Sequence, residues 1–438
     1  MEAITIVVLL ILIVLMIRRK KYFFNPVTIF SGTWIIIVFL ANLKLYDMIE
    51  YDEKIIVMIL LANLSFFIGN IPKKGIRCVI GTKKSTKRNK GNYYVYEYKI
   101  NKPFVIFCMV VAFISIGVVL LSVIKLLLSG SSYSYIRDIL FGYDTDATLV
   151  NSGVFMLFFT WIVSGIVYAF MPLALIEFFE RKKFNSWAIY GLILAGVFTF
   201  ATAGRAVIFV LVIQVIVLLK HYDYTIPKRI KRTVIMVAIG AIGMLFIISY
   251  FRTKSIVDKH VNSVYSYFCI SVPLLSHWVE YVDANNIYTW GRATLYGVDS
   301  ILNWILRFVG IQTPKYMLIN EAVNLPQNNW LTIFHNPVSR YNAFCSALYY
   351  FYLDFRWIGI VVLSLLCGLV INNVFNLLKN AKDKKCMFYY LLIVQMLVLS
   401  FIKLQTSNPP YIFALLIINF AIKRVKIINQ AKGEMIGK

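Results

Sequence analysis

Residues 103–124 read PFVIFCMVVAFISIGVVLLSVI, an apolar run without a charged side chain. A helix rises about 1.5 Å per residue, so roughly 20 such residues cross the ~30 Å hydrocarbon core of a bilayer. Inside lipid every backbone N–H and C=O must be bonded within the protein, and a helix does this on its own. The run therefore predicts a helix that spans a membrane.

Similar runs recur along the chain of 438 residues, of which 60% are hydrophobic and 15% charged, with a mean hydropathy of +0.74. This composition excludes an ordinary soluble domain. We expect an all-α, polytopic transmembrane bundle of about eleven spans. The other expected spans are residues 3–17, 27–43, 55–71, 153–178, 185–202, 206–219, 233–250, 357–378, 387–402 and 410–422.

Lysine and arginine gather in alternate connections between these helices. Most of the 45 basic residues lie at 18–21, 73–102, 181–183, 220–232, 379–385 and after 422. Cytoplasmic connections are the basic ones in membrane proteins, so we expect the N-terminus outside and the C-terminus inside. Contact with anionic lipid then explains the formal charge of +25, and no nucleic-acid partner is expected.

One connection, residues 251–356, is far longer than the others and is expected outside. It divides the chain into helices 1 to 8 (residues 1–250), the large external loop (251–356) and helices 9 to 11 (357–438). The many aromatic and aliphatic residues of the loop argue against disorder. Residues 264–281 and 300–309 are predicted to form amphipathic helices at the membrane surface.

No metal or other cofactor is expected. The six cysteines lack metal-ligand spacing, and no glycine-rich phosphate loop joins a strand to a helix. The two cysteines expected outside, Cys269 and Cys345, fit either a disulfide or two buried thiols. The spans hold few ionisable residues, chiefly Glu177 near a cytoplasmic helix end, whereas ion-coupled transporters usually keep such residues at mid-membrane.

External arginines are the candidate functional groups. Arg205 follows Thr202, Ala203 and Gly204 at an external turn between two apolar helices. A guanidinium offers a planar fork of donors that matches phosphate, although an interfacial arginine or a helix-end ion pair would also fit here. Because acids are also frequent outside, some external arginines must be paired. The long loop adds Arg252, Arg292, Arg307, Arg340 and Arg356.

Two motifs stand beside this architecture. The run Arg340-Tyr341-Asn342-Ala343-Phe344 is followed by Tyr352-Leu353-Asp354-Phe355, directly ahead of a predicted helix. Together with the 202–205 turn and the single long external loop, these runs resemble the oligosaccharide repeat-unit polymerases, the O-antigen and capsule polymerases of the Wzy type. The resemblance covers the architecture of nearly the whole chain, whereas its motifs are short.

The chain departs from the family pattern at two positions. The family usually has Asp-Phe-Gly where this chain has Asp354-Phe355-Arg356, which puts a tight backbone role for that turn in doubt. It often has a threonine where this chain has Cys345. Gly359 nevertheless fits a close helix approach. The pair His335-Asn336 resembles the His-Asn of the related O-antigen ligases.

The resemblance implies a multi-pass protein of the bacterial cytoplasmic (inner) membrane. It would join polyprenyl-pyrophosphate-linked oligosaccharide repeat units on the outer face, as a metal-independent glycosyltransferase. Expected partners are this lipid-linked oligosaccharide, membrane lipid, and a chain-length regulator and a flippase of the same pathway.

The resemblance also implies residue roles. Arginines would hold the pyrophosphate charge, and His335 would take the proton of the acceptor hydroxyl. Carboxylate alternatives to His335 are Asp354, Glu280 and Asp283. The catalytic candidates are His335, Arg205 and Arg340, and the substrate-binding candidates are Arg252, Arg292, Asn336, Asn342 and Asp354.

Two other functions fit the same architecture. A flippase would move the lipid-linked oligosaccharide without making a bond, but we would expect it to have short, even connections and cations inside the bundle. A transferase like the O-antigen ligases would share His335 and the arginines but use a different acceptor. The sequence does not separate the polymerase from the ligase.

Overall fold

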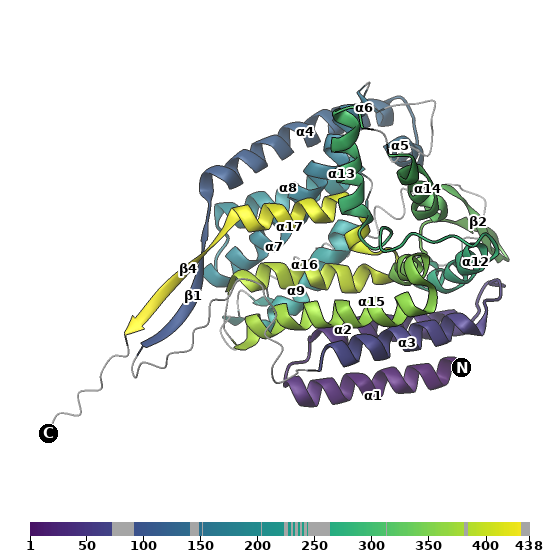
Figure 1. Ribbon diagram of the computed structural model, residues 1–438. Coiled ribbons are helices and arrows are strands. Elements are labelled where there is room, and N and C mark those ends of the chain that lie inside the picture. Colours follow the sequence, from purple (N-terminus) through teal and green to yellow (C-terminus); the bar gives the residue numbers. More distant parts are fainter. Residues whose placement is uncertain are drawn as a thin grey trace.

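The computed structural model describes residues 1–71, 92–140, 149–150, 152–202, 204–222, 263–311, 313–380 and 384–430, with short pieces between 227 and 243. These residues are mostly helical, and the long helices run side by side as a bundle (Figure 1). Two small antiparallel sheets of two strands each accompany the helices. The all-α prediction did not include these sheets.

Four helical stretches are long and apolar enough to cross a membrane, which indicates a membrane protein. They are α4 (Lys102–Leu128), the helix Gly153–Arg181 that ends in α7 (Ser164–Arg181), most of α15 (Ser346–Asn380), and Lys384–Phe401, which contains α16 (Lys384–Val398). Shorter apolar helices are α2 (Pro26–Asn42), α8 (Ser186–Thr202), α9 (Ala206–His221) and α17 (Pro409–Ala421).

Most of the predicted spans coincide with helices of the structure. Residues 3–17 and 55–71 fall in α1 (Glu2–Lys20) and α3 (Glu53–Gly69), and the others fall in the helices above. The exception is the span at 233–250, which lies largely outside the described residues. The number of spans and their orientation in a membrane stay predictions.

Helices α3 and α15 pack backbone to backbone. A Cβ on Gly69 would clash with the carbonyl oxygen of Leu365, and one on Gly368 would lie 2.5 Å from that of Phe66. Small residues permit the two helices to approach this closely. Lipid tails are as apolar as the helix surfaces, so the hydrophobic effect does not hold transmembrane helices together, and van der Waals contact between close helices does so instead. On the outside of the bundle, Phe107 of α4 is 65% exposed, as expected of a side chain that faces lipid.

Helix α15 is broken near its start. Phe355 and Arg356 leave the helical conformation, and Arg356 has a φ of 53°. A Cβ on Gly359 would clash with the carbonyl oxygen of Phe351, so the close approach at Gly359 is between the two segments of α15 on either side of this break. Residues 346–354, predicted as the end of the loop, form a buried helical segment instead.

The described part of the long connection forms a cap at one end of the bundle, together with the N-terminus and α5 (Tyr133–Leu140) (Figure 1). The two predicted amphipathic helices fall within α11–α12 and α13. The cap consists of α11 (Ser263–Cys269), α12 (Ser271–Ala284), α13 (Tyr296–Phe308), α14 (Pro314–Asn328), and the hairpin of β2 (Leu331–His335) and β3 (Val338–Tyr341).

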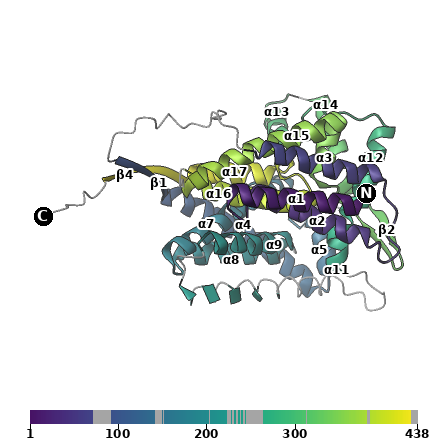
Figure 2. The same cartoon turned by 90° about the horizontal axis from the view of Figure 1, so that it is seen from below.

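The other end of the bundle carries β1 (Asn92–Ile100) and β4 (Ile422–Gln430), which pair antiparallel and project away from the helices. Figures 1 and 2 both show the N-terminus and β2 far from β4. We call the two ends the cap end and the strand end. Among the described residues, the strands β1 and β4 of the segments predicted to be cytoplasmic lie at the strand end, and the cap of the predicted external loop lies at the other end.

Candidate functional site

Arg205 lies in the turn between α8 and α9, at the cap end. The N–H of Gly204 donates to the carbonyl oxygen of Thr199 at the end of α8, and Arg205 is the N-cap residue of α9. The guanidinium carbon of Arg205 lies 5.9 Å from the centre of the Tyr267 ring. Burial lowers the pKa of this guanidinium, so its charge sits in a partly desolvated place where electrostatic interactions are stronger than in water.

Tyr267 belongs to a group of four rings, the aromatic face, formed by Tyr267, Phe268, Phe344 and Phe401. Ring centres are 5.1 Å apart for Tyr267 and Phe344, 5.8 Å for Tyr267 and Phe401, and 5.3 Å for Phe268 and Phe401. Aromatic pairs at such distances contribute about 0.5–1.5 kcal/mol each beyond their buried area. The 202–205 turn and the 340–344 run, distant in sequence, therefore meet through Tyr267.

Two more polar side chains lie close to Arg205. Tyr341 of β3 and Arg137 of α5 are near enough for their charges to affect the pKa of Arg205, Tyr341 raising it and Arg137 lowering it. The guanidinium groups of Arg137 and Arg205 are thus close enough to repel each other.

Lys403 is a further cation that the sequence analysis did not single out. It follows Phe401 of the aromatic face and interacts with Cys345, the neighbour of Phe344. Burial lowers the pKa of its amine to about 8, so the amine is still mostly protonated at neutral pH. Its side chain has no ion pair or hydrogen bond within the described part of the chain. The sequence feature that could have identified Lys403 is its position at the predicted outer end of the span at 387–402.

The hairpin β2–β3 separates two groups of candidate residues. Phe334 and Tyr341 lie on its inner face, with ring centres 5.6 Å apart. His335 pairs with Val338, so His335 and Arg340 share the outer face. Arg340 lies two residues beyond Val338, the partner of His335, and such diagonal neighbours across an antiparallel pair lie roughly 7–8 Å apart. The structure thus brings His335 and Arg340 together but leaves Arg205 on the inner side of the hairpin.

His335 and Asn336 lie at the exposed tip of this hairpin. Their N–H groups donate to the carbonyl oxygens of Asp47 and Tyr46, at 3.1 and 3.3 Å. The side chains of His335 and Arg340 are exposed and have no hydrogen bond or ion pair to any described residue. Both side chains are accessible to a ligand.

Asp354 has a different environment from the other candidates, because it is fully buried. Its Oδ1 accepts hydrogen bonds from the Thr289 hydroxyl and from the N–H groups of Gly291 and Ala293, at 2.5, 2.8 and 3.0 Å. Its Oδ2 accepts one from the Thr294 N–H at 2.8 Å. Four donors occupy this carboxylate, so its role in the structure is to hold the 289–294 turn on α15.

Two more predicted substrate-binding residues have partners within the cap. Arg292 forms a forked ion pair with Asp299, at 2.9 and 3.0 Å from Nη2 to the two oxygens. Asn342 donates from Nδ2 to the carbonyl oxygen of Gln327 at 2.6 Å. Arg252 lies outside the described residues.

The described residues hold neither the ligand set of a metal ion nor a disulfide. They contain no group of three His, Cys, Asp or Glu side chains that could hold a metal ion. Cys269 and Cys345 are free and buried, which decides between the two possibilities left open by the sequence. Two cavities of the described structure also lie away from the aromatic face, one beside Arg307 and one at the strand end.

Comparison with known proteins gives no match: neither a family model, nor a curated protein, nor a solved structure is similar to this chain.

Replacing Asp354 by Asn should destabilise the protein, because an amide NH₂ would face N–H donors in a buried site. We expect the free energy of unfolding to fall by about 3 kcal/mol. A lower unfolding midpoint of the purified protein in neutral detergent would measure this. The control is Asp299→Asn, whose ion pair is partly exposed and should contribute less than about 1 kcal/mol. An Asp354→Asn protein that is as stable as the wild type but inactive would contradict the positional role.

Proposed function

We propose that this protein is a polysaccharide polymerase of the outer face of a bacterial cytoplasmic membrane. It would join polyprenyl-pyrophosphate-linked oligosaccharide repeat units into O-antigen or capsular polysaccharide. The observation that carries the proposal is the meeting of the 202–205 turn with the 340–344 run on one aromatic face. These are two of the motifs on which the family resemblance rests.

The proposal includes a topology of about eleven spans, with the N-terminus and the cap end outside. The basic connections of the strand end would then face the cytoplasm and its anionic lipid. A flippase would deliver the substrate to the cap end, and a chain-length regulator would act on the growing polymer there.

In the proposed reaction, a hydroxyl oxygen of the acceptor sugar attacks the anomeric carbon of the donor. A new glycosidic C–O bond forms, and the bond from that carbon to the pyrophosphate oxygen breaks. The polyprenyl pyrophosphate leaves with both bonding electrons, and the hydroxyl proton passes to a base. Pyrophosphate is already a good leaving group, so catalysis needs mainly cations for its charge and a base for the proton.

Arg205 is the cation we assign to the pyrophosphate. Its guanidinium is partly desolvated beside Tyr267, where a bidentate contact with phosphate gains more than it would in water. Lys403 adds a second positive charge next to the same aromatic face. Three of the rings, Tyr267, Phe268 and Phe344, are partly exposed and offer an apolar surface at the end of the bundle, where a polyprenyl chain would leave the lipid.

The outer face of the hairpin is the surface we assign to the acceptor. His335, Asn336 and Arg340 are all exposed there. A neutral imidazole can accept a proton on a ring nitrogen, so His335 is suited to take the hydroxyl proton. Arg205 lies on the inner side of the hairpin, whereas His335 lies on the outer face. The donor and acceptor sugars must therefore meet at the edge of the hairpin.

Arg205→Ala should abolish polymer formation while the protein still inserts in normal amount, because deletion of a phosphate-pairing cation removes catalysis and little folding energy. Arg205→Lys should restore only part of the activity, since an ammonium lacks the bidentate fork. Polymer length on a gel and protein amount on a blot measure the two effects. Arg307→Ala is the control, because Arg307 also lies beside a tyrosine ring in the cap but away from the aromatic face. Polymer of normal length from Arg205→Ala would refute the assignment.

His335→Ala separates a polymerase from a flippase. If His335 is the base, polymer formation should fall roughly 10²- to 10⁴-fold, the usual contribution of a positioned acid or base. Single lipid-linked repeat units should then accumulate on the outer face, because transport upstream still works. Units trapped on the inner face would favour the flippase instead. A loss below tenfold would leave His335 as a sugar contact and not the base.

A further inference from the structure

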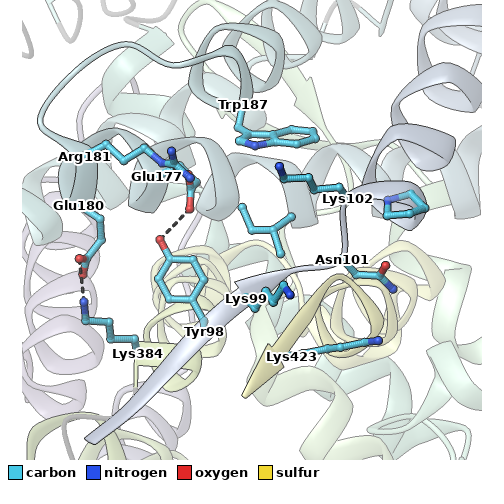
Figure 3. Close-up of a pocket in the computed structure, with 12 residues that line it drawn as sticks. Tyr98, Lys99, Asn101, Lys102, Glu177, Glu180, Arg181, Trp187, Lys384 and Lys423 are labelled. Carbon is cyan, nitrogen blue, oxygen red and sulfur yellow. Dashed lines mark hydrogen bonds and ion pairs between the residues drawn. The ribbon is translucent and has the colours of Figure 1, made fainter. Parts of the chain in front are cut away.

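A cavity of 820 Å³ lies at the strand end of the bundle. Its walls come from the junction of β1 with α4, the end of α7, the starts of α8 and α16, and the start of β4. Figure 3 shows side chains from these elements around one space, with cations on several sides. Five cations and two carboxylates line it, so its balance of charge is positive.

Both carboxylates are already occupied by other partners. Glu177 is buried and accepts from Arg181 Nε at 2.6 Å, from the Tyr98 hydroxyl at 2.7 Å and from Asn185 at 3.0 Å. The second carboxylate is Glu180. It pairs with Lys384 at 2.9 Å and accepts from the Tyr222 hydroxyl at 2.8 Å. These pairs leave three lysines of the lining without a carboxylate.

The remaining lysines are Lys99, Lys102 and Lys423. Within the described chain, none of the three has an ion pair or a side-chain hydrogen bond. Lys99 and Lys423 are direct partners in the β1–β4 register. Two like charges directly opposite each other destabilise a strand pair, and an anion between them would remove that cost.

The start of α4 adds to the positive potential. Helix α4 begins at Lys102 without a side-chain cap, and a helix N-terminus carries a partial positive charge. Figure 3 shows the Lys102 side chain extending beside the Trp187 ring. Indole rings are enriched at the level of lipid headgroups, because one part of the ring is apolar and the N–H is polar.

We propose that this cavity binds the phosphate headgroup of an anionic membrane lipid. A phosphate diester or monoester would lie among Lys99, Lys102 and Lys423. Basic pockets between transmembrane helices are suited to such headgroups. The inference does not depend on the proposed polymerase activity.

Two helices that begin at the cavity favour a lipid over a soluble phosphate compound. Exposed apolar side chains follow the cavity along both of them, Ile106 and Phe107 on α4 and Ile189 and Ile193 on α8. These side chains would contact the acyl chains of a lipid whose headgroup occupies the cavity. A soluble phosphate compound would gain nothing from them.

The test uses the full-length protein, delipidated in a neutral detergent and titrated with phosphatidylglycerol, phosphatidylcholine or glycerol 3-phosphate. The readout is the unfolding midpoint as a function of ligand concentration. Phosphatidylglycerol should raise the midpoint at the lowest concentration. The variant Lys99→Gln/Lys102→Gln/Lys423→Gln should bind it about 100-fold more weakly, at about fivefold per lysine.

A control variant removes the same charge from the same end of the bundle without touching the cavity. In Arg18→Gln/Arg19→Gln/Lys183→Gln all three residues are exposed and none lines the cavity. This variant should respond to phosphatidylglycerol like the wild type. Equal loss in the two variants, or no loss in either, would overturn the site. Equal responses to glycerol 3-phosphate and phosphatidylglycerol would assign the cavity to a soluble phosphate compound and overturn the lipid.

Discussion

The cap depends on one buried carboxylate. Asp354 accepts four hydrogen bonds from the 289–294 turn, and the N–H of Thr289 returns one to the carbonyl oxygen of Leu353. The Thr406 hydroxyl then donates to the carbonyl oxygen of Thr294 and ties the same turn to the segment before α17. A buried carboxylate is costly unless donors surround it, so the turn and the start of α15 hold each other in position.

The positions of the candidate groups follow from this anchor. Once residues 346–354 are fixed in the bundle, the preceding 340–344 run must approach the start of α15 along the aromatic face. Tyr341 then faces inward toward Arg205, while Arg340, its neighbour on the strand, faces outward. The alternation of side chains along β3 therefore divides the predicted catalytic residues between two faces.

Much of the helical framework could be predicted, because a long apolar run in a membrane must form a helix to satisfy its backbone hydrogen bonds. The hairpin β2–β3 could not, since its strands are short and their hydrophobic pattern is interrupted by a bulge between Thr332 and Phe334. The motifs at 202–205 and 340–344 were found, but their meeting through Tyr267 depends on tertiary packing.

Individual roles were harder to predict than elements. Asp354 has the residue type of a catalytic or ligand-binding group, and only the four donors around it reveal a structural role. Arg292 likewise becomes a partner of Asp299, seven residues further along the chain. Lys403 was not singled out, because a lysine at the end of an apolar run is usually an interfacial residue. Its partial burial follows from the fold.

The central claim is that the cap end, with Arg205 and the aromatic face, lies outside the cell. Single cysteines introduced into a cysteine-free background and treated with a membrane-impermeant maleimide test it most directly. Cysteines at Ser131 and Asn286 should be labelled in intact cells, and cysteines at Ser85 and Asp383 only after permeabilisation. Labelling of Ser85→Cys in intact cells would contradict the account.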